Sequence, residues 1–393
     1  MTHNTGRFEI SAFALNRVPA IDFGPGRART VGEAARALMP AGGGAILLVA
    51  DMMLVELGLA RPVIESLAAI GAKVAVFDGI AGEPKETQVE AAIAAARSCG
   101  AGLVVALGGG SALDVGKIAA CIGPCGRPPS DFALAANPLP VDGLPAICLP
   151  TTAGTGSELS ATNIYANAAG KKVWIWGAET KPRRVILDPE LTLSLPPHLT
   201  AWTGADAFVH ALEASTNRWR NEGNDLYAHR AIALIAGALE MAVREPGNVA
   251  ARGRMLLGSA YAGIAIDNCG TAIAHNISHA LAGLAPIHHG LATALGLEVT
   301  LPWQVAADTG PFAAAAEAAG LGHDAKALAD WYTDWLTRCG VARKLPEAFK
   351  VFSATDLARE MRSVENAPMR KATAREVGDG DVERLAKGVM GLT

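Results

Sequence analysis

Histidine residues are concentrated in one part of this 393-residue sequence, because six of the nine lie between residues 210 and 289. Asp206 and His210 are four residues apart in a stretch with helical spacing, so both side chains project from one helix face. His275 and His279 repeat this spacing in a second helical stretch, and His289 follows in a turn. The spacing predicts that a cation binds among these side chains.

Imidazole and carboxylate ligands together restrict the identity of that cation. A set rich in nitrogen suits Fe(II) or Zn(II) and does not suit Mg(II) or Ca(II), which prefer oxygen. The alternative is a group of buried core histidines that are hydrogen-bonded and bind no metal. Two pairs with the same spacing and a fifth group, on apolar stretches that otherwise avoid polar residues, favour the metal site.

A glycine-rich turn follows an apolar, strand-like run and reads Gly108-Gly109-Gly110-Ser111. Glycines allow a ligand to approach the backbone closely, and the N–H groups that begin the next helix attract an anion such as a pyrophosphate. Asp114 stands three residues after Ser111, so these two side chains have an alternative explanation as a helix capping box. The turn matches neither the GxGxxG fingerprint nor the P-loop of nucleotide-binding proteins.

A second turn, rich in small and hydroxyl-bearing residues, follows the apolar run at residues 146–149. Residues 150–158 read PTTAGTGSE, in which Thr151, Thr152 and Thr155 supply hydroxyl groups. Open α/β sheets bind ligands at the carboxyl ends of their strands, where two such turns can meet. The two turns together predict a dinucleotide site.

Asp51 follows the apolar run at residues 45–50 and is a candidate for selecting the dinucleotide. Its carboxylate could accept hydrogen bonds from both ribose hydroxyls of an adenosine, and it would repel a 2′-phosphate. This interpretation predicts NAD in preference to NADP. The alternative is that Asp51 is the N-cap of a helix.

The elements that position these residues alternate in the first half of the chain. Short apolar runs predict strands at residues 45–50, 73–77, 103–107 and 146–149. Amphipathic stretches between them predict helices at residues 61–70 and 86–98. This order predicts a Rossmann-like α/β domain with a parallel sheet covered by helices on both faces. After Pro196-Pro197 the strand pattern nearly vanishes and helical spacing continues. We therefore expect a dinucleotide-binding α/β domain at residues 1–197 and an all-α metal-binding and substrate domain at residues 198–393.

The composition argues against several classes of protein. The formal net charge is −4 and no run of Lys and Arg is present, so no nucleic-acid partner is expected. The longest apolar runs are strand-sized, so no membrane span is expected either. The start MTHNTGRFEI lacks the apolar core of a signal peptide, and the six cysteines form no CxxC pair. These features predict a cytoplasmic protein with reduced thiols.

The motifs resemble those of the iron-containing (group III) alcohol dehydrogenase family, and the resemblance spans most of the chain. Its carriers are GGGS with Asp114 and Lys117, PTTAGTGSE, DPEL at residues 188–191, TGAD with His210, and the histidines at 275, 279 and 289. The resemblance implies a dehydroquinate synthase-like two-domain architecture, with a metal and a nicotinamide facing each other between the domains. It also implies a homodimer, and hydride transfer between nicotinamide C4 and a small alcohol or aldehyde.

The resemblance further implies roles for individual residues. It assigns Fe(II), with Zn(II) as the other candidate, to four ligands: Asp206, His210, His275 and His289. His279 falls on a non-ligand histidine near the nicotinamide and is the candidate proton relay. His288 has no counterpart in the family pattern. The positions expected to contact NAD are Asp51, Gly108, Gly109, Gly110, Ser111, Asp114, Thr151, Thr152, Thr155, Ser160, Lys172 and Leu191.

The expected substrate pocket departs from the family pattern. The pocket is expected to include Thr162, Ile266 and Asp267, and the family commonly has Phe and Ser at the last two positions. Trp202 stands where a small residue is usual, and Glu83 replaces a more usual Asn. The substrate therefore stays open. The alternatives are a sister branch with the same architecture (polyol dehydrogenases, dehydroquinate synthase-like lyases or maleylacetate reductases) and a protein that binds NAD and metal without catalysis.

Overall fold

A parallel sheet of six strands forms the first half of the chain in the computed structural model, which describes residues 12–307 and 310–392. The order across the sheet is β1-β8-β5-β4-β2-β3, and the paired strands run parallel. The bounds are Ala20–Phe23 (β1), Ala45–Asp51 (β2), Val74–Ile80 (β3), Ala101–Gly108 (β4), Ala146–Pro150 (β5) and Arg184–Leu187 (β8). The four strands expected from the sequence correspond to β2, β3, β4 and β5.

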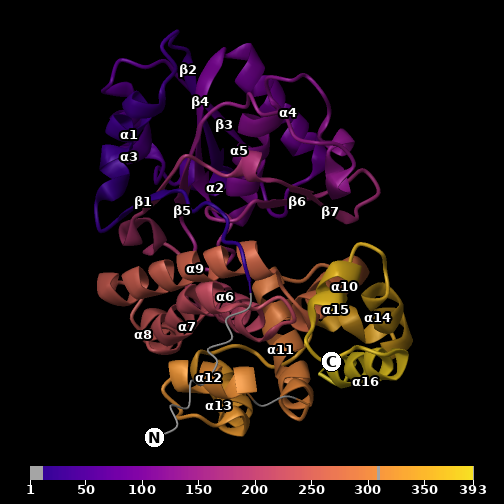
Figure 1. Cartoon of the computed structure of the whole chain (residues 1–393). Helices are drawn as coiled ribbons and strands as arrows, with labels where there is room; N and C mark the ends of the chain where they lie inside the picture. The colour runs from indigo at the N-terminus through magenta and orange to yellow at the C-terminus, as the bar shows by residue number, and fades with distance from the viewer. Residues whose placement is uncertain (1–11, 308–309, 393) are drawn as a thin grey trace, which may run out of the picture.

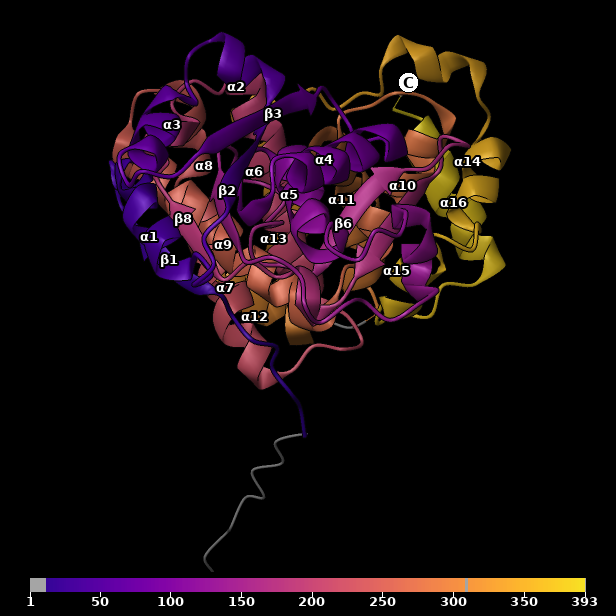
Figure 2. The same cartoon turned by 90° about the horizontal axis from the view of Figure 1, so that it is seen from above.

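Helices cover both faces of this sheet, as Figure 2 shows. Alternate residues of β2 separate the two faces. Leu47 and Val49 pack with α4 (Glu86–Ser98) and α5 (Gly110–Ile122), whereas Leu48 packs with α1 (Val31–Leu38) and α3 (Arg61–Ala68). The short helix α2 (Met52–Glu56) follows β2 directly. Strands that are buried on both faces carry continuous apolar runs, so the predicted α/β fold class is confirmed.

An antiparallel hairpin lies outside the sheet and consists of β6 (Thr162–Ala166) and β7 (Lys172–Trp176). The sequence analysis did not predict this hairpin, or the sheet strands β1 and β8. The hairpin packs on α5 and carries two residues of the expected sites, Thr162 and Lys172. The described residues also include short 3-10 helices, at Arg27–Thr30 (η1), Pro129–Asp131 (η2), Ala133–Ala135 (η3), Ala178–Thr180 (η4), Pro189–Thr192 (η5) and Glu347–Val351 (η6).

The second half of the chain is helical, and within the described residues it contains no strand. Its helices are α6 (Pro197–Thr216), α7 (Glu222–Ala236), α8 (Leu239–Arg244), α9 (Val249–Cys269), α10 (Ile273–Leu284), α11 (His289–Val305), α12 (Gly310–Ala318), α13 (Ala325–Arg338), α14 (Ala354–Met361), α15 (Ala367–Ala372) and α16 (Asp379–Met390). Across residues 12–307 and 310–392, no helix has both the length and the apolar character needed to cross a bilayer.

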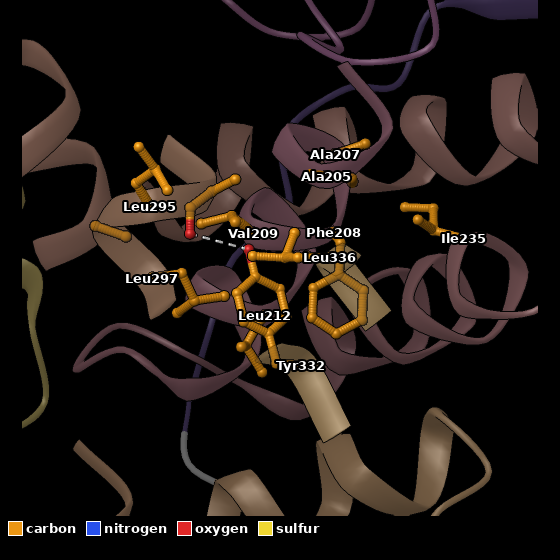
Figure 3. Close-up of a cluster of buried hydrophobic side chains, with 14 of the residues drawn as sticks. Ala205, Ala207, Phe208, Val209, Leu212, Ile235, Leu295, Leu297, Tyr332 and Leu336 are labelled. Carbon is orange, nitrogen blue, oxygen red and sulfur yellow. Dashed lines mark hydrogen bonds between the residues drawn. The ribbon is translucent and has the colours of Figure 1, made fainter. Parts of the chain in front are cut away.

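Helix α6 is the central helix of this half. Every residue from Thr203 to Thr216 is buried. In Figure 3, Phe208 and Leu212 of α6 lie beside Tyr332 of α13, and the Tyr332 hydroxyl donates a hydrogen bond to the carbonyl oxygen of Ala294 at 3.3 Å. This packing fixes the orientation of α6, and with it the direction of the polar side chains that α6 carries.

The loop after β5 lies where the sheet half contacts the helical half. The two halves lie one above the other in Figure 1. A Cβ atom at Gly156 would lie 2.4 Å from the Cα of Gly263 in α9, and Gly156 has a φ of +61°. A Cβ atom at Gly154 would lie 2.7 Å from the Cβ of Thr203 in α6. Only glycine allows approaches this close. The loop therefore packs directly on α6 and α9.

The first described residues run along the helical half before the chain enters β1 (Figure 1). A Cβ atom at Gly223 of α7 would lie 2.4 Å from the ring of Phe13. The Asn16 side-chain amide donates to the carbonyl oxygen of Asp267 in α9 at 2.9 Å. The segment contacts both halves, because Arg17 donates to the carbonyl oxygens of Lys181 and Pro182 at 3.4 to 3.5 Å.

Candidate metal centre

Four side chains from three helices meet at one point in the helical half. Asp206 and His210 lie on α6, His275 lies on α10, and His289 is the first residue of α11. One ligand atom from each side chain lies within 4.8 Å of the other three. The structure thus brings together the four residues that the family resemblance assigned to a metal.

The imidazole nitrogens of the cluster face a single carboxylate oxygen. Asp206 Oδ1 lies 3.6 Å from His289 Nε2 and 3.7 Å from His275 Nε2. The same oxygen lies 4.0 Å from His210 Nε2. These distances exceed those of hydrogen bonds. The His289 side chain is 26% exposed, whereas that of Asp206 is 2% exposed, so the cluster is most open beside His289.

Two atoms of the cluster are buried without a hydrogen-bond partner within the part of the chain that the structure describes, namely Asp206 Oδ1 and His275 Nε2. An unpaired buried polar group costs about 1–3 kcal/mol, so such atoms are rare unless something binds them. A cation would satisfy both atoms at once. Three imidazoles and one carboxylate are ligands of Fe(II) and Zn(II), so the residues fit a divalent transition metal.

Burial keeps the imidazoles of His275 and His289 neutral. It is the main reason that the pKa of His275 falls to about 3; the nearby His210 lowers this pKa further, and Asp206 opposes both effects. Burial, followed by the charge of Lys172, also holds the pKa of His289 well below its usual value of 6.5. Neutral imidazole is the form that binds a metal, so no proton has to leave these rings at neutral pH.

The protein holds the other ring nitrogen of two of these histidines. His210 Nδ1 lies 3.2 Å from the carbonyl oxygen of Gly154, in the loop after β5. His289 Nδ1 lies 3.1 Å from the hydroxyl oxygen of Ser278 on α10. The carbonyl of Gly154 can only accept, so it places the proton of a neutral His210 ring on Nδ1 and leaves Nε2 free for a metal, and the Ser278 hydroxyl holds the orientation of the His289 ring.

Glu213 of α6 is the partner of the third histidine, and the sequence analysis missed it. Its Oε2 accepts a hydrogen bond from His275 Nδ1 at 2.7 Å, and the carboxylate also accepts the backbone N–H groups of Ala272 and Ala274 at 2.6 and 2.7 Å. Burial raises the pKa of Glu213 to about 7, against the effect of these donors. The available signal was its position three residues after His210, on the same side of the helix.

His279 and His288 lie beside the cluster without joining it. The ring centroid of His279 lies 5.6 Å from that of His289, but His279 is not part of the four-residue group found in the described residues. His288 is the N-cap of α11, because its Nδ1 accepts the backbone N–H of Gly290 at 3.2 Å. Of the adjacent pair, His289 therefore faces the cluster and His288 has a capping role.

The glycine-rich turn and the threonine-rich loop lie against each other, after the neighbouring strands β4 and β5. A Cβ atom at Gly110 would lie 2.8 Å from the Cγ2 of Thr155, and one at Gly109 would lie 3.4 Å from the Cγ2 of Thr152. Gly108 has a φ of +152°, a conformation that side chains rarely adopt. The convergence of the two turns, which the sequence predicted, is present in the structure.

Ser111 and Asp114 do not form the capping box that was the alternative interpretation. Gly109 is the N-cap of α5, so Ser111 lies within the first turn of the helix. Asp114 is buried; it accepts the backbone N–H of Ile164 at 2.9 Å and the hydroxyl of Ser157. These bonds position the segment that follows the loop, and a contact of Asp114 with the cofactor remains a prediction.

Lys117, buried one turn after Asp114, supports the same segment. Its ammonium group donates at 2.7 to 3.2 Å to three backbone carbonyls, those of Ser157, Ser160 and Thr162. The lysine therefore shapes the start of the hairpin from behind. The hydroxyl of Ser160 donates to the carbonyl of Thr162 at 3.3 Å.

Asp51 occupies the helix-cap position that was considered as its alternative role. Its Oδ1 accepts the backbone N–H of Met53 at 2.9 Å, at the start of α2. A Cβ atom at Gly108 would lie 3.5 Å from the Cβ of Asp51, so the residue also borders the glycine-rich turn.

Leu191, in η5, is half-buried against the sheet and its α1–α3 layer.

Lys172 links the hairpin to the metal cluster. Its ammonium group lies 2.6 Å from Glu83 Oε1. Burial lowers the pKa of both His279 and His289, and the positive charge of Lys172 lowers both pKa values further. The hairpin therefore brings a positive charge close to the rings of α10 and α11.

Asp267 of α9 has a different environment from the one expected of a substrate-pocket residue. Its side chain is 1% exposed and forms an ion pair with Lys181. It also accepts the backbone N–H of Ala161 at 2.6 Å and the Asn16 side-chain amide at 3.0 Å. The carboxylate is engaged inside the protein, and a contact of Asp267 with the substrate stays a prediction. Ile266, its neighbour, is half-buried.

Family models match both halves of the chain. The model described as "Iron-containing alcohol dehydrogenase" matches residues 19–189, and "Fe-containing alcohol dehydrogenase family, C-terminal" matches residues 200–349. The chain belongs to the iron-containing alcohol dehydrogenase family. The family predicted from the sequence is confirmed, and with it an oxidoreductase of the class that uses iron and NAD.

Relatives of this dehydrogenase have differing substrates in their names. It is 36% identical over 313 residues to the 1,3-propanediol dehydrogenase of Klebsiella pneumoniae, covering 77% of this chain and 78% of the relative. It is 37% identical over 252 residues to Long-chain-alcohol dehydrogenase 1 of Geobacillus thermodenitrificans, and this match covers 64% of each chain, just under two thirds.

Solved structures of relatives share the whole fold. A 1,3-propanediol oxidoreductase superposes with a TM-score of 0.87 and 30% identity, covering 96% of this chain and 100% of the relative. A sulfoacetaldehyde reductase from Bifidobacterium kashiwanohense, in complex with NAD+, has a TM-score of 0.87 and 31% identity, covering 98% and 100%. The two-domain architecture expected from the resemblance is therefore confirmed.

Proposed function

We propose that this dehydrogenase interconverts a small alcohol and its aldehyde or ketone with NAD(H), at a metal held by Asp206, His210, His275 and His289. The observation that carries the proposal is the buried four-residue cluster, in which two atoms have no partner among the described residues. When bound, the metal supplies a Lewis acid that polarises the substrate oxygen, and the nicotinamide supplies or accepts the hydride.

His279 is the residue that we assign to proton transfer. Oxidation of an alcohol releases one hydride and one proton, so a neutral base near the substrate oxygen is required. Burial and then the charge of Lys172 hold the pKa of His279 well below 6.5, so its imidazole is neutral in the resting protein and would hold a proton only transiently while relaying it. In the reverse direction the same nitrogen returns the proton. Four candidate ligands are present without His279, so His279 is not needed to hold the metal.

The cofactor would lie along the carboxyl ends of β4 and β5. The backbone of the glycine-rich turn and the start of α5 would bind the pyrophosphate, because N–H groups at a helix N-terminus attract anions. The oxygen of Asp51 that does not cap α2 would accept the adenosine ribose hydroxyls, which favours NAD over NADP. The remaining contacts that we assign are Thr151, Thr152, Thr155, Ser160, Lys172 and Leu191, with Thr162 and Ile266 assigned to the substrate pocket.

The organisation of the protein is part of the proposal. We assign residues 1–197 to cofactor binding and residues 198–393 to metal and substrate binding; in support, α6 begins at Pro197 and the two family matches separate between residues 189 and 200. We also propose a homodimer in the cytoplasm, without nucleic-acid or membrane partners. The family resemblance and the net charge of −4 support this assignment.

The experiment that tests the function is a substrate panel on protein stripped of metal and reloaded separately with Fe(II) or Zn(II). The panel includes 1,3-propanediol, a long-chain alcohol and sulfoacetaldehyde, because relatives carry these names. Oxidation or formation of NADH is followed by absorbance. We expect turnover only after metal loading, and faster turnover with NAD(H) than with NADP(H). Equal rates before and after metal removal would exclude the proposed role of the cluster.

A further inference from the structure

The carboxylate of Glu213 connects two of the helices that carry the metal cluster. Glu213 lies three residues after His210 on α6, and its side chain is 2% exposed. Its Oε1 accepts the N–H of Ala274, and its Oε2 accepts the N–H of Ala272 and the Nδ1 of His275. Three donors from the start of α10 therefore converge on one side chain of α6.

The bond to His275 has a direct consequence for the free nitrogen of that ring. Both oxygens of Glu213 already accept backbone N–H groups, so the carboxyl group acts as an acceptor toward the ring as well, which places the proton of the neutral ring on Nδ1. Nε2 then carries the free lone pair; it lies 3.7 Å from Asp206 Oδ1 and has no partner in the described residues. Glu213 thus selects the tautomer that can bind a metal.

The three histidines differ in what holds their Nδ1 atoms. His210 meets a backbone carbonyl and His289 meets a hydroxyl, at 3.2 and 3.1 Å. His275 meets a carboxylate at 2.7 Å. Hydrogen bonds to an ionised acceptor are shorter and roughly twice as strong as neutral ones. His275 is therefore the ligand whose orientation and basicity depend most on a side chain of the protein.

A second function of Glu213 must be separated from this one. The N-cap residue of α10 is Ala272, which has no side chain that can cap the helix, so Glu213 also performs that task from α6. A cap contributes to stability without any relation to a metal. A Glu213 variant could lose metal because His275 is no longer held or because the start of α10 is no longer capped. The two causes can be told apart only if the cap is restored independently.

We propose that Glu213 is a positioning residue of the metal centre, which holds His275 in the tautomer and orientation that bind the cation. This inference rests on the proposed ligand set. It extends that set by a carboxylate that does not touch the metal but raises the affinity of the site for it. Outer-shell partners of this kind typically change metal affinity by about 10–100-fold.

The test compares three variants of the full-length protein by competition with a chelator for Zn(II). Glu213→Gln replaces one oxygen by a donor group, so the charged acceptor is lost and one of the three N–H groups meets another donor. We expect about 10–100-fold weaker Zn(II) binding. Ala272→Ser supplies a helix cap at the N-cap position, and the double variant tests whether capping alone explains the loss. We expect the double variant to regain thermal stability but not Zn(II) affinity.

Co(II) loading adds a readout that a cap would not move. The visible absorption bands of bound Co(II) report ligand geometry, and we expect them to shift in Glu213→Gln and to stay shifted in the double variant. The proposal would be wrong if Glu213→Gln had the Zn(II) affinity and the Co(II) bands of the unmodified protein. It would also be wrong if adding Ala272→Ser restored both properties. In either case Glu213 would be only a helix cap.

Two further measurements test the role of Glu213 independently of whether the variant folds and of whether the four proposed ligands are correct. If Glu213→Gln does not fold, nitrogen-15 NMR of the unmodified Zn(II)-loaded protein decides: a proton on His275 Nε2, or none on Nδ1, would contradict the proposal. His275→Ala is measured in parallel. If His275→Ala retains its metal, the ligand set is wrong; if it loses metal while Glu213→Gln does not, only the role of Glu213 is wrong.

Discussion

His210 Nδ1 lies 3.2 Å from the carbonyl oxygen of Gly154, so a metal-ligand candidate on α6 is oriented by the loop that follows β5. The same loop carries Thr152 and Thr155, which touch the glycine-rich turn. The predicted cofactor site and the metal cluster therefore share a backbone segment. Whatever moves this loop should affect both binding events.

Gly154→Ala tests this connection. The added Cβ would lie 2.7 Å from the Cβ of Thr203, so the loop must shift, at a cost of about 1–3 kcal/mol. We expect weaker binding of both Zn(II) and NADH, measured by chelator competition and by fluorescence titration. Gly247→Ala is the matched control, because nothing lies within 4 Å of a Cβ atom there. A loss of only one affinity would show that the loop does not connect the two sites.

His275→Ala should remove the metal and the turnover together. One of four ligands is lost, so the affinity should fall by more than the roughly 10–100-fold that an outer-shell partner contributes. Cofactor binding should survive, because the predicted dinucleotide contacts lie on the other half of the chain. Elemental analysis and NADH titration check the two halves. Stoichiometric metal with a near-normal rate would contradict the ligand assignment.

His279→Ala should keep its metal and lose rate. We expect kcat to fall by roughly 10²–10⁴-fold, the range typical of a missing general acid or base, with a changed pH profile. The ring lies 5.6 Å from that of His289 but outside the four-residue cluster, so metal content should not change. Metal lost in proportion to activity would make His279 a ligand, and an unchanged rate at every pH would remove it from the mechanism.

Asp51 should determine the preference for NAD over NADP. Asp51→Asn removes the charge but retains a good N-cap for α2, so the effect on the cofactor is separated from that on the helix. We expect the ratio of kcat/KM with NAD to kcat/KM with NADP to fall by about tenfold, or ~1.4 kcal/mol. Asp51→Gly should narrow it as well. An NADP preference in the unmodified protein would mean that Asp51 acts only as a cap.

Glu158 predicts a dependence of stability on pH. Burial raises its pKa from 4.5 to about 7, with the backbone and Lys117 opposing, and its Oε1 has no partner in the described residues. The folded protein thus favours the protonated acid, and the associated stability is full below pH 4.5 and is lost as the pH rises through about 7.

Glu158→Gln should remove this dependence. At pH 8 the variant should unfold at a higher temperature than the unmodified protein. The free energy of unfolding should differ by at most about 3.5 kcal/mol, since each pKa unit corresponds to roughly 1.4 kcal/mol. Near pH 4.5 the difference should disappear. Calorimetry at several pH values between these limits measures it. A difference that is constant with pH would show that Glu158 stays ionised in the folded protein.

The sequence predicted those parts of the site that depend on local periodicity. Asp206 and His210 are one helical turn apart, and β2 and β4 are continuous apolar runs, so their roles follow from neighbours in the chain. The partners of buried carboxylates do not follow in this way. Glu213 meets His275 across 62 positions, and Asp267 meets Lys181 across 86, so only the folded chain shows that these pairs exist.

The hairpin β6–β7 was missed for a related reason. Its strands are five residues each, and it lies outside the sheet whose buried runs were recognisable. Lys117 supports the start of the hairpin and the segment before it by donating to carbonyls 40 to 45 positions away. The support that this short segment receives comes from its partner strand and from a buried lysine in another element, neither of which local periodicity reveals.

The ion pair between Lys181 and Asp267 restricts how the two halves of this protein can change in evolution. Lys181 is 3% exposed, and its partner is 1% exposed, on the opposite half of the molecule. Breaking a buried pair by removing one partner typically costs about 3–5 kcal/mol. A Ser in place of Asp at position 267 would leave the Lys181 ammonium group buried and without its counter-charge. A change at either residue is therefore expected to need a matching change in the other half of the molecule.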